Sequence, residues 1–418
     1  MDKAILLNRD FSQAGQLKPD KVDSPLQIED AGGENTLRFN YPVQEHERLA
    51  HTWRIYNDWN EVSDVFLLGE AELAIDDGFY TAWPNNCLFF DPSTEKFVQV
   101  YNSGTGHMTG AQQVYVRTLD YKNTDDWSDA VLIIGDEPGL ELPLTHLALL
   151  CNNGDYIAFP RRMDEDKTVY GHDICRSADK GATWGKQDWA SIIDFSAITD
   201  PGVLDRAKAG IVKSDGTIIV IGRAGANKDF VAVSTNHGVS WTAHEAPEFE
   251  GGVFSAEEST LLELPNGKIL LLGRKPPLVE HDNKRGVLYS VSNDGIVWST
   301  PDDTNMPDGT ASPHAMIYHS ESGIVEVFAG SRYSGYLDGK SSLWRHTATP
   351  EMAEQGLFYP GVRIVTSEKR GAGADFGYPA AANAPDGFVL LTWYDGDRDD
   401  TGTAIYQLTG RRVKKGEA

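Results

Sequence analysis

The sequence predicts an all-β fold, a six-bladed β-propeller whose blades are four-stranded antiparallel sheets. Three observations predict it: a repeated strand–turn–strand unit, a Trp-containing turn that follows three of these units, and the lack of any segment with a sustained helical apolar period. The chain has 418 residues, 40% of them apolar, and 41 glycines, which suits a large core built from many short strands.

The repeated unit is a β-hairpin with a glycine in its turn. Two apolar runs are joined by an Asn-Gly, Asp-Gly or Ser-Gly pair, the strongest short-range signal for a hairpin. A sixth unit, with a longer turn, begins at Tyr80. Units of this length match propeller blades of four strands. The turn glycines are Gly154, Gly216, Gly267, Gly323 and Gly387.

A second motif follows three of the hairpins. It has the form Ser-x-Asp/Asn-x-Gly-x-Thr/Ser-Trp at residues 177–184 and 234–241, and is shortened at 292–298. The Asp or Asn side chain can bond the backbone of its own turn, glycine tolerates a positive φ, and Trp packs into the sheet. We interpret these motifs as Asp-box turns, with a structural role in preference to a metal site at Asp179 or Asp294.

The repeats define the domain organisation. Residues 1–60 lack the repeat and are expected to form an N-terminal arm or connector, residues 61–412 the propeller, and residues 413–418 a flexible tail. The first residues contain a four-residue apolar run where a secretory signal needs about 7–15, so we expect no signal peptide. No stretch approaches the ~18 apolar residues of a spanning helix, so we expect no membrane insertion.

The net charge of −25 excludes some partners. With 62 acidic and 37 basic residues, the average field repels nucleic acid and anionic membranes, so an anionic ligand must be bound by a local group of cations. The three cysteines have the spacing of neither a disulfide framework nor a zinc site, so we expect buried thiols and no metal or organic cofactor. They are Cys87, Cys151 and Cys175.

Arginine recurs at one position of the repeat. Arg161, Arg223 and Arg274 each follow the turn glycine by seven residues, and Arg332 follows its glycine by nine. Like positions of successive blades converge on the central mouth of a propeller, and a guanidinium matches a carboxylate in bidentate fashion. The pattern predicts a carboxylate-binding site. The alternative, that each arginine only pairs with an acidic neighbour, stays open, above all for Arg161 and Arg223.

A carboxylate accompanies one of these arginines. Glu258 begins the strand whose hairpin partner ends with Arg274, so we expect both side chains at the same end of the hairpin. A register error of one residue would exchange Glu258 with Glu257. Glu263, in the same strand, is expected to face solvent or to pair locally. Glu258 is therefore the candidate catalytic carboxylate.

Tyr378 and His107 complete the candidate site. Tyr378 begins the last unit at a phase similar to that of Glu258, and a phenol beside a carboxylate base can act as a nucleophile. His107 lies in the Gly-rich stretch NSGTGHMTG and is a candidate proton carrier. The alternatives are a core tyrosine and an ordinary exposed histidine.

Residues 62–410 resemble the sialidase superfamily. The stretch EESTLLELPNGKILLLGR is similar to the sialidase segment that carries the catalytic glutamate and the second arginine of a triad, which implies these roles for Glu258 and Arg274. VFAGSR resembles the segment with the last triad arginine, here Arg332, and DFGYPAAANAPDGFVLLTWYD the segment with the nucleophilic tyrosine, here Tyr378.

The first unit departs from the exo-acting sialidases. Their Tyr-Arg-Ile-Pro-like motif, which supplies the first arginine, reads Tyr80-Thr81-Ala82-Trp83-Pro84 here. FLLGEAELAIDDGFYTAWPNN and YNSGTGHMTGAQQVYV instead resemble the endosialidases of bacteriophage tailspikes, which implies a role for His107. By analogy the chain would be a homotrimer on a virion tail or outside the cell after release, and otherwise cytoplasmic. Because those enzymes lack the tyrosine, a covalent tyrosyl route and direct attack by water both stay open.

The sequence thus predicts a glycoside hydrolase of the sialidase type. Its partner would be an acidic oligo- or polysaccharide, sialic-acid-like or otherwise, such as a capsule or surface polymer. Two alternatives from other classes remain: a propeller that binds host glycans as a receptor-binding head without cleaving them, and a polysaccharide lyase acting on uronate polymers.

Overall fold

The computed structural model describes most of the chain from residue 71 onward and three strands before it. The described residues are 26–31, 34–39, 64–68, 71–107, 109–135, 143–164, 166, 168–199, 202–224, 228–246, 258–274, 286–306, 314–331, 341–359, 361–367, 374–397 and 402–414. The predicted site residue Arg332 and Glu257, the register alternative to Glu258, lie outside these residues.

The chain divides into two units. The first comprises residues 1–68 and 410–418, and the second residues 69–409. In the first unit, β1 (Leu26–Ala31) pairs antiparallel with β2 (Glu34–Phe39). Also in this unit, β3 (Asp64–Leu68) pairs antiparallel with residues 410–414 of β30 (Ala404–Lys414).

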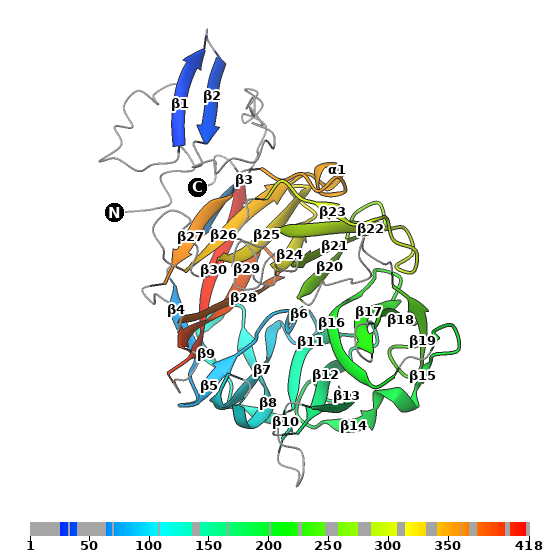
Figure 1. The fold of residues 1–418 in the computed structure, drawn as a ribbon. Helices are drawn as coiled ribbons and strands as arrows, with labels where there is room; N and C mark the ends of the chain where they lie inside the picture. The colour runs from blue at the N-terminus through cyan, green and yellow to red at the C-terminus, as the bar shows by residue number, and fades with distance from the viewer. Residues whose placement is uncertain are drawn as a thin grey trace. The chain divides into compact units, whose positions relative to one another are not determined.

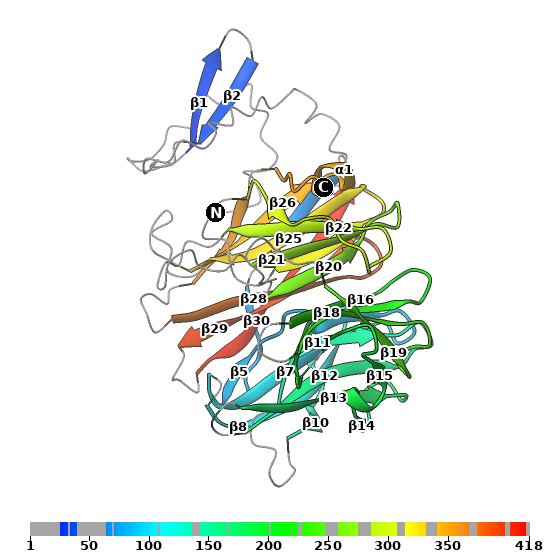
Figure 2. The same cartoon turned by 45° about the vertical axis from the view of Figure 1, so that its right-hand side comes forward.

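The second unit is an all-β propeller (Figure 1). Each of its first five blades is made of strands that follow one another in the chain, and the blades succeed one another in colour from cyan to orange in Figures 1 and 2. Two blades add short strands to the four-stranded antiparallel plan. The helices among the described residues include α1 (Pro350–Ala353) and the 3-10 turn η4 (Trp189–Ser191), and none is long and apolar enough to span a membrane.

The strand bounds of the five blades are as follows. The first has β5 (Tyr80–Ala82), β6 (Leu88–Asp91), β7 (Lys96–Gly106), β8 (Thr109–Asp120), β9 (Asn123–Trp127) and β10 (Val131–Ile134). The second has β11 (Leu144–Leu150), β12 (Tyr156–Met163), β13 (Val169–Ser177) and β14 (Gly185–Asp188). The third has β15 (Ile193–Asp194), β16 (Leu204–Val212), β17 (Ile218–Ala224), β18 (Lys228–Ser234) and β19 (Trp241–Glu245). The fourth has β20 (Ser259–Glu263), β21 (Ile269–Arg274), β22 (Val287–Ser292) and β23 (Asp302–Asp303), and the fifth has β24 (His314–His319), β25 (Ile324–Ser331), β26 (Ser342–Ala348) and β27 (Val362–Thr366).

The predicted propeller of four-stranded antiparallel blades is confirmed, but the predicted number of six blades is wrong, because the described part of the chain forms five blades of consecutive strands. The repeat around Gly387 supplies only β28 (Ala374–Asn383), β29 (Phe388–Asp397) and β30 to a closing sheet, and β4 (Glu72–Ile75) pairs with β30 as the fourth strand of this unit. An open sheet edge exposes unpaired backbone N–H and C=O groups, which pairing with β4 satisfies. The closing sheet thus joins strands from the two ends of the unit.

Apolar side chains fill the space between neighbouring sheets. Trp189, Trp241 and Phe159 are buried in one cluster between the second and third blades, and Phe97 and Leu390 in another between the first blade and the closing sheet. All seven residues of β17 are buried, as expected for a strand covered on both faces. The inner strands β6, β11, β16, β20, β24 and β28 contact one another in that order, and β28 returns to β6. This ring positions the candidate site.

The three Trp-containing turns share a set of hydrogen bonds. In the first, the backbone N–H of Gly181 donates to Ser177 Oγ (2.8 Å), that of Thr183 to Asp179 Oδ1 (2.8 Å), and Trp184 Nε1 to the Gly181 carbonyl (3.1 Å). Bonds from Thr183 lower the pKa of Asp179 to about 2. Equivalent bonds occur in the turns at residues 234–241 and 292–298.

Replacing Gly295 by alanine is expected to destabilise the propeller more than replacing Gly267. Both glycines have φ +80°, which costs an L-residue roughly 1–2 kcal/mol. A Cβ at Gly295 would lie 2.1 Å from Cδ1 of the buried Ile219, whereas nothing lies within 4 Å of one at Gly267. Overpacking adds about 1–3 kcal/mol. Urea unfolding of both variants measures the difference in their free energies of unfolding. Equal losses of stability would contradict the close packing of Ile219 against Gly295.

Candidate active site

Glu258 is hydrogen-bonded to both of its predicted partners. Its Oε1 accepts from the hydroxyl of Tyr378, and its Oε2 forms an ion pair with Nη1 of Arg274. Glu258 directly precedes β20 and Arg274 ends β21, and the Arg274 N–H donates to the Glu258 carbonyl (3.1 Å). Glu258 and Arg274 are half-buried, and Tyr378 is 7% exposed. The predicted carboxylate, guanidinium and phenol therefore form one connected group.

The backbone of Tyr378 is in an unusual conformation. Its φ is +50°, it follows Gly377 with φ +117°, and the register of β28 against β29 shifts between Gly377 and Ala380. Few residues other than glycine adopt a positive φ, and a residue before proline, such as Tyr378 before Pro379, is further restricted. A bulge of this kind re-aims a side chain, and backbone strain concentrates at functional sites. The strained segment directs the phenol to Glu258.

His107 belongs to a second hydrogen-bonded group around the buried Asp375. Nδ1 of His107 lies 2.6 Å from Asp375 Oδ2 and 2.7 Å from the hydroxyl of Tyr80, which itself donates to Oδ2. Tyr394 donates to Asp375 Oδ1 (2.8 Å). Asp375 is fully buried, whereas the His107 side chain is 24% exposed. The rings of Tyr394 and Tyr378, 5.5 Å apart between centroids, connect this group to the first.

His146 and two arginines lie beside these groups. The His146 ring centroid is 6.0 Å from that of Trp83 and 6.5 Å from that of Tyr378. Burial, followed by the charges of Arg161 and Arg206, lowers the pKa of His146 to about 3, so the ring is neutral near pH 7. Burial and Arg206 also lower the pKa of Arg161, to about 10.

Arg161 and Arg206 share a carboxylate, that of Asp205. Arg161 Nη1 lies 3.8 Å from Asp205 Oδ1, and Arg206 Nε lies 3.3 Å from Oδ2. Arg161 is 4% exposed and Arg206 is half-buried. Two guanidinium groups on one carboxylate leave an excess of positive charge beside His146.

Arg223 pairs with a different carboxylate. Its Nε lies 3.0 Å from Asp229 Oδ1, which also accepts from Nζ of Lys208 (2.8 Å), and all three side chains are almost fully buried. Burial lowers the pKa of Lys208 to about 8 in spite of the ion pair. This arrangement fits the structural alternative for Arg223, and its role in binding substrate stays a prediction.

Two smaller predictions are confirmed. Glu263 pairs locally, since both its carboxylate oxygens accept from Ser214, at 2.7 and 3.0 Å. The three cysteines are buried thiols, and burial raises the pKa of Cys87 and that of Cys151, the latter to about 11.

Several residues that the structure places with the candidate site were not predicted from the sequence. The sequence spacing could have indicated some of them. His146 and Arg206 stand eight to ten residues before a turn glycine, as Glu258 and Tyr378 do. Tyr394 follows its turn glycine by seven residues, as three of the predicted arginines do, whereas Asp375 has no equivalent carboxylate in the other repeats. The missed residues are Tyr80, His146, Asp205, Arg206, Asp375 and Tyr394.

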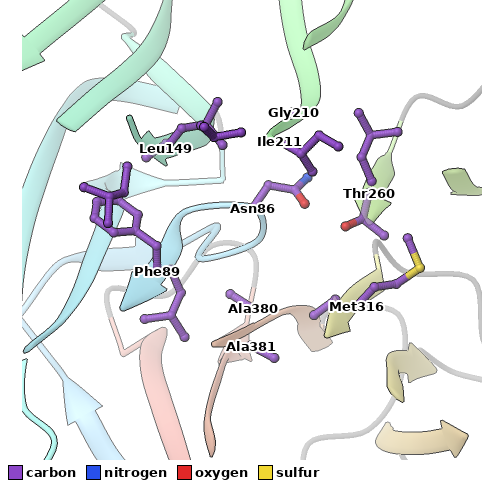
Figure 3. Close-up of a pocket in the computed structure, with 15 residues that line it drawn as sticks. Asn86, Phe89, Leu149, Gly210, Ile211, Thr260, Met316, Ala380 and Ala381 are labelled. Carbon is purple, nitrogen blue, oxygen red and sulfur yellow. The ribbon is translucent and has the colours of Figure 1, made fainter. Parts of the chain in front are cut away.

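A pocket of about 260 Å³ lies between the inner strands, further along them than the site residues (Figure 3). Its lining includes Ala148, Ile211, Thr260 and Ala380, each from a strand that has a site residue near or directly before its beginning. Asn86 extends into it and donates to the carbonyls of Lys208 (3.1 Å) and Ser259 (2.8 Å). None of the residues that line this pocket is charged, so the charged groups of the candidate site are not part of its lining.

Comparison with known proteins identifies the class of this chain. It matches the BNR repeat-like domain over residues 95–391, and so belongs to that family. No curated protein matches it. A protein of unknown function from Dyadobacter fermentans DSM 18053 is 15% identical with a TM-score of 0.65, covering 83% of this chain and 99% of that one.

Two other similar structures are sialidase-type enzymes. The endosialidase of phage phi92 is 10% identical with a TM-score of 0.62, over 84% of this chain and 70% of that one. Trypanosoma rangeli sialidase is 14% identical with a TM-score of 0.54, over 79% and 55%. The fold of this chain is therefore that of the sialidase propellers.

Proposed function

We propose that this chain is a glycoside hydrolase of the sialidase type, which cleaves a sialic-acid-like or other acidic glycan. The observation that carries the proposal is the pair of contacts at Glu258, whose carboxylate accepts from the Tyr378 hydroxyl and pairs with the Arg274 guanidinium. A carboxylate bonded to a phenol can accept its proton and make the oxygen a nucleophile. The likeness to phage phi92 endosialidase and to Trypanosoma rangeli sialidase supports the choice of substrate class.

The substrate carboxylate would bind to Arg274 together with Arg332, which the resemblance to sialidases implies. A guanidinium has five N–H donors, so the bond from Arg274 Nη1 to Glu258 is compatible with a further contact to the substrate. Arg161 and Arg206 add positive charge at the same mouth. This local excess would attract an anionic sugar in spite of the net charge of −25.

The first step would form a glycosyl–tyrosine bond. The Tyr378 oxygen attacks the anomeric carbon while Glu258 takes the phenol proton. The glycosidic C–O bond breaks, and its electron pair stays on the leaving oxygen, which receives a proton from His107.

The second step would release the product. Water attacks the anomeric carbon and gives a proton to His107, and the C–O bond to Tyr378 breaks. The phenolate recovers its proton from Glu258. Both steps together consume one water molecule and return every protein group to its starting state.

Product release tests this proposal. The protein would be incubated with sialic acid oligomers and polymers and, separately, with uronate polymers, and we expect new reducing ends from the sialic acid substrates only. Retention on the polymers without cleavage would indicate a receptor-binding propeller instead. Ultraviolet absorbance of an unsaturated uronate would indicate a lyase. Sedimentation of the same protein tests the homotrimer proposed by analogy with tailspikes.

A further inference from the structure

Asp375 is a buried carboxylate that joins three polar rings at the mouth. It is fully buried, and its oxygens contact Tyr80 from β5, Tyr394 from β29 and His107 from the end of β7. A buried carboxylate is costly unless it is hydrogen-bonded, and here two phenol hydroxyls donate to it. These donors stabilise its ionised form.

The hydrogen bonds determine which nitrogen of His107 carries a fixed proton. Tyr80 has one hydroxyl proton, which it donates to Asp375. An ionised carboxylate only accepts, so Nδ1 of His107, 2.6 Å from Asp375 Oδ2, must be the donor of that contact. In the neutral ring, Nε2 is therefore the nitrogen without a proton. Within the described residues Nε2 makes no hydrogen bond, and the ring is partly exposed.

We infer that Asp375 is a positioning residue that holds His107 with a proton on Nδ1, so that Nε2 carries the proton given to the leaving group. The catalytic part of this inference rests on the proposed function. On donation, the Nε2–H bond breaks, an O–H bond forms on the leaving oxygen, and the neutral ring stays bonded to Asp375 through Nδ1. The lone pair left on Nε2 can then accept the proton of the attacking water.

The ring of His107 lies between aromatic neighbours. It contacts the edges of Tyr80 and Trp83, with centroids 5.7 and 5.2 Å away. Beyond Trp83 lies His146, which Arg161 and Arg206 help to keep neutral against the opposite effect of Glu258. His107 thus contacts the Asp375 carboxylate directly, whereas the neutral His146 lies near charges of both signs.

The experiment is a nitrogen-15 NMR titration of the histidine rings in the wild type and in Asp375→Asn, with pH–rate profiles on the same proteins. We expect the neutral His107 ring to be protonated on Nδ1 in the wild type and this preference to weaken in Asp375→Asn, because a carboxylate only accepts hydrogen bonds whereas an amide both donates and accepts. Since the proton for the leaving group is carried on Nε2, a ring that is no longer held in this way should lower kcat by about tenfold to a hundredfold. His146 stays neutral between about pH 5 and 8 in both proteins and serves as the internal reference.

Asp395→Asn is the matched control. Asp395 lies on the neighbouring strand β29 and accepts from Ser367 Oγ (2.8 Å), so its replacement should leave the proton of His107 on Nδ1. Tyr394→Phe, which removes one donor from Asp375, provides a second variant if Asp375→Asn does not fold. It keeps the carboxylate as an acceptor, so the neutral His107 ring should stay protonated on Nδ1.

The two readouts separate two kinds of failure. A neutral His107 ring protonated on Nε2 in the wild type or in Tyr394→Phe, or an undiminished preference for Nδ1 in folded Asp375→Asn, would overturn the inference even if the enzyme is active. A wild type that cleaves no glycan would overturn the proposed function, and the NMR result on Asp375 would stand.

Discussion

Replacing Glu258 by glutamine is expected to lower kcat on the true substrate about a thousandfold, with little change in KM. Glutamine keeps the shape of the side chain and a carbonyl oxygen that can accept from Arg274, but it does not take up the proton of Tyr378. Since the lost interaction belongs to the transition state, substrate binding should remain. Initial rates over a range of substrate concentrations measure both constants.

Glu263→Gln is the matched control for this variant. Glu263 lies in the same hairpin, on β20, and bonds to Ser214 at 2.7 and 3.0 Å, away from Tyr378. Its replacement should leave kcat within about twofold, which corresponds to less than 1 kcal/mol. A Glu258→Gln enzyme that keeps wild-type turnover would show that this carboxylate is not the base.

The configuration of the first-formed product decides between the two routes that the sequence leaves open. A covalent intermediate on Tyr378 requires two displacements and gives retention, whereas a single attack by water activated at Glu258 gives inversion. The hydrogen bond between Tyr378 and Glu258 favours retention. Proton NMR of the product, recorded before the anomers equilibrate, would show which route operates.

The part of the site that the sequence predicted lies within single hairpins or at one phase of the repeat. Glu258 and Arg274 come together because they end paired strands, and a backbone hydrogen bond joins them directly. Tyr378 shares the phase of Glu258, so the repeat brings it to the same mouth. Hairpin register and repeat phase are both readable from spacing, which is why these three residues were predictable.

The remaining site residues depend on closure of the ring and on irregular backbone. Asp375 meets Tyr80 and His107 only because the closing sheet packs beside the first blade, and no local pattern encodes that contact. Tyr378 reaches Glu258 from a positive φ at a bulge, which propensities for a residue before proline disfavour. The contribution of β4 to the closing sheet likewise depends on tertiary pairing, so the repeat count alone predicted one blade too many.

Replacing Asp229 by asparagine is expected to lower the free energy of unfolding by about 3–5 kcal/mol, since removing one partner of a buried ion pair leaves uncompensated charge. Asp229 is the shared partner of Lys208 and Arg223, and all three side chains are at most 5% exposed. Arg223 stays charged at any accessible pH, so it accounts for most of the loss. Lys208 can respond by releasing its proton.

The release of that proton gives the Asp229→Asn variant a distinctive pH dependence. Burial already lowers the pKa of Lys208 to about 8, and without Asp229 it falls further. Between the folded pKa and the unfolded value near 10.4, the unfolded state binds more protons, so stability rises with pH in that window. This pH window begins at lower pH in Asp229→Asn than in the wild type. The difference in free energy of unfolding between the two proteins should therefore shrink between about pH 6 and pH 9.

Urea unfolding at the two pH values measures this change, with Asp215→Asn as the control. Asp215 pairs with Lys213 at 2.9 Å, but its side chain is 56% exposed, so its replacement should cost less than about 1 kcal/mol at either pH. If Asp229→Asn and Asp215→Asn lose a similar free energy of unfolding, water must reach Asp229 and its two cationic partners. In that case the third blade would hold Arg223 loosely enough to turn to a ligand, and the substrate-binding role predicted for it would regain support.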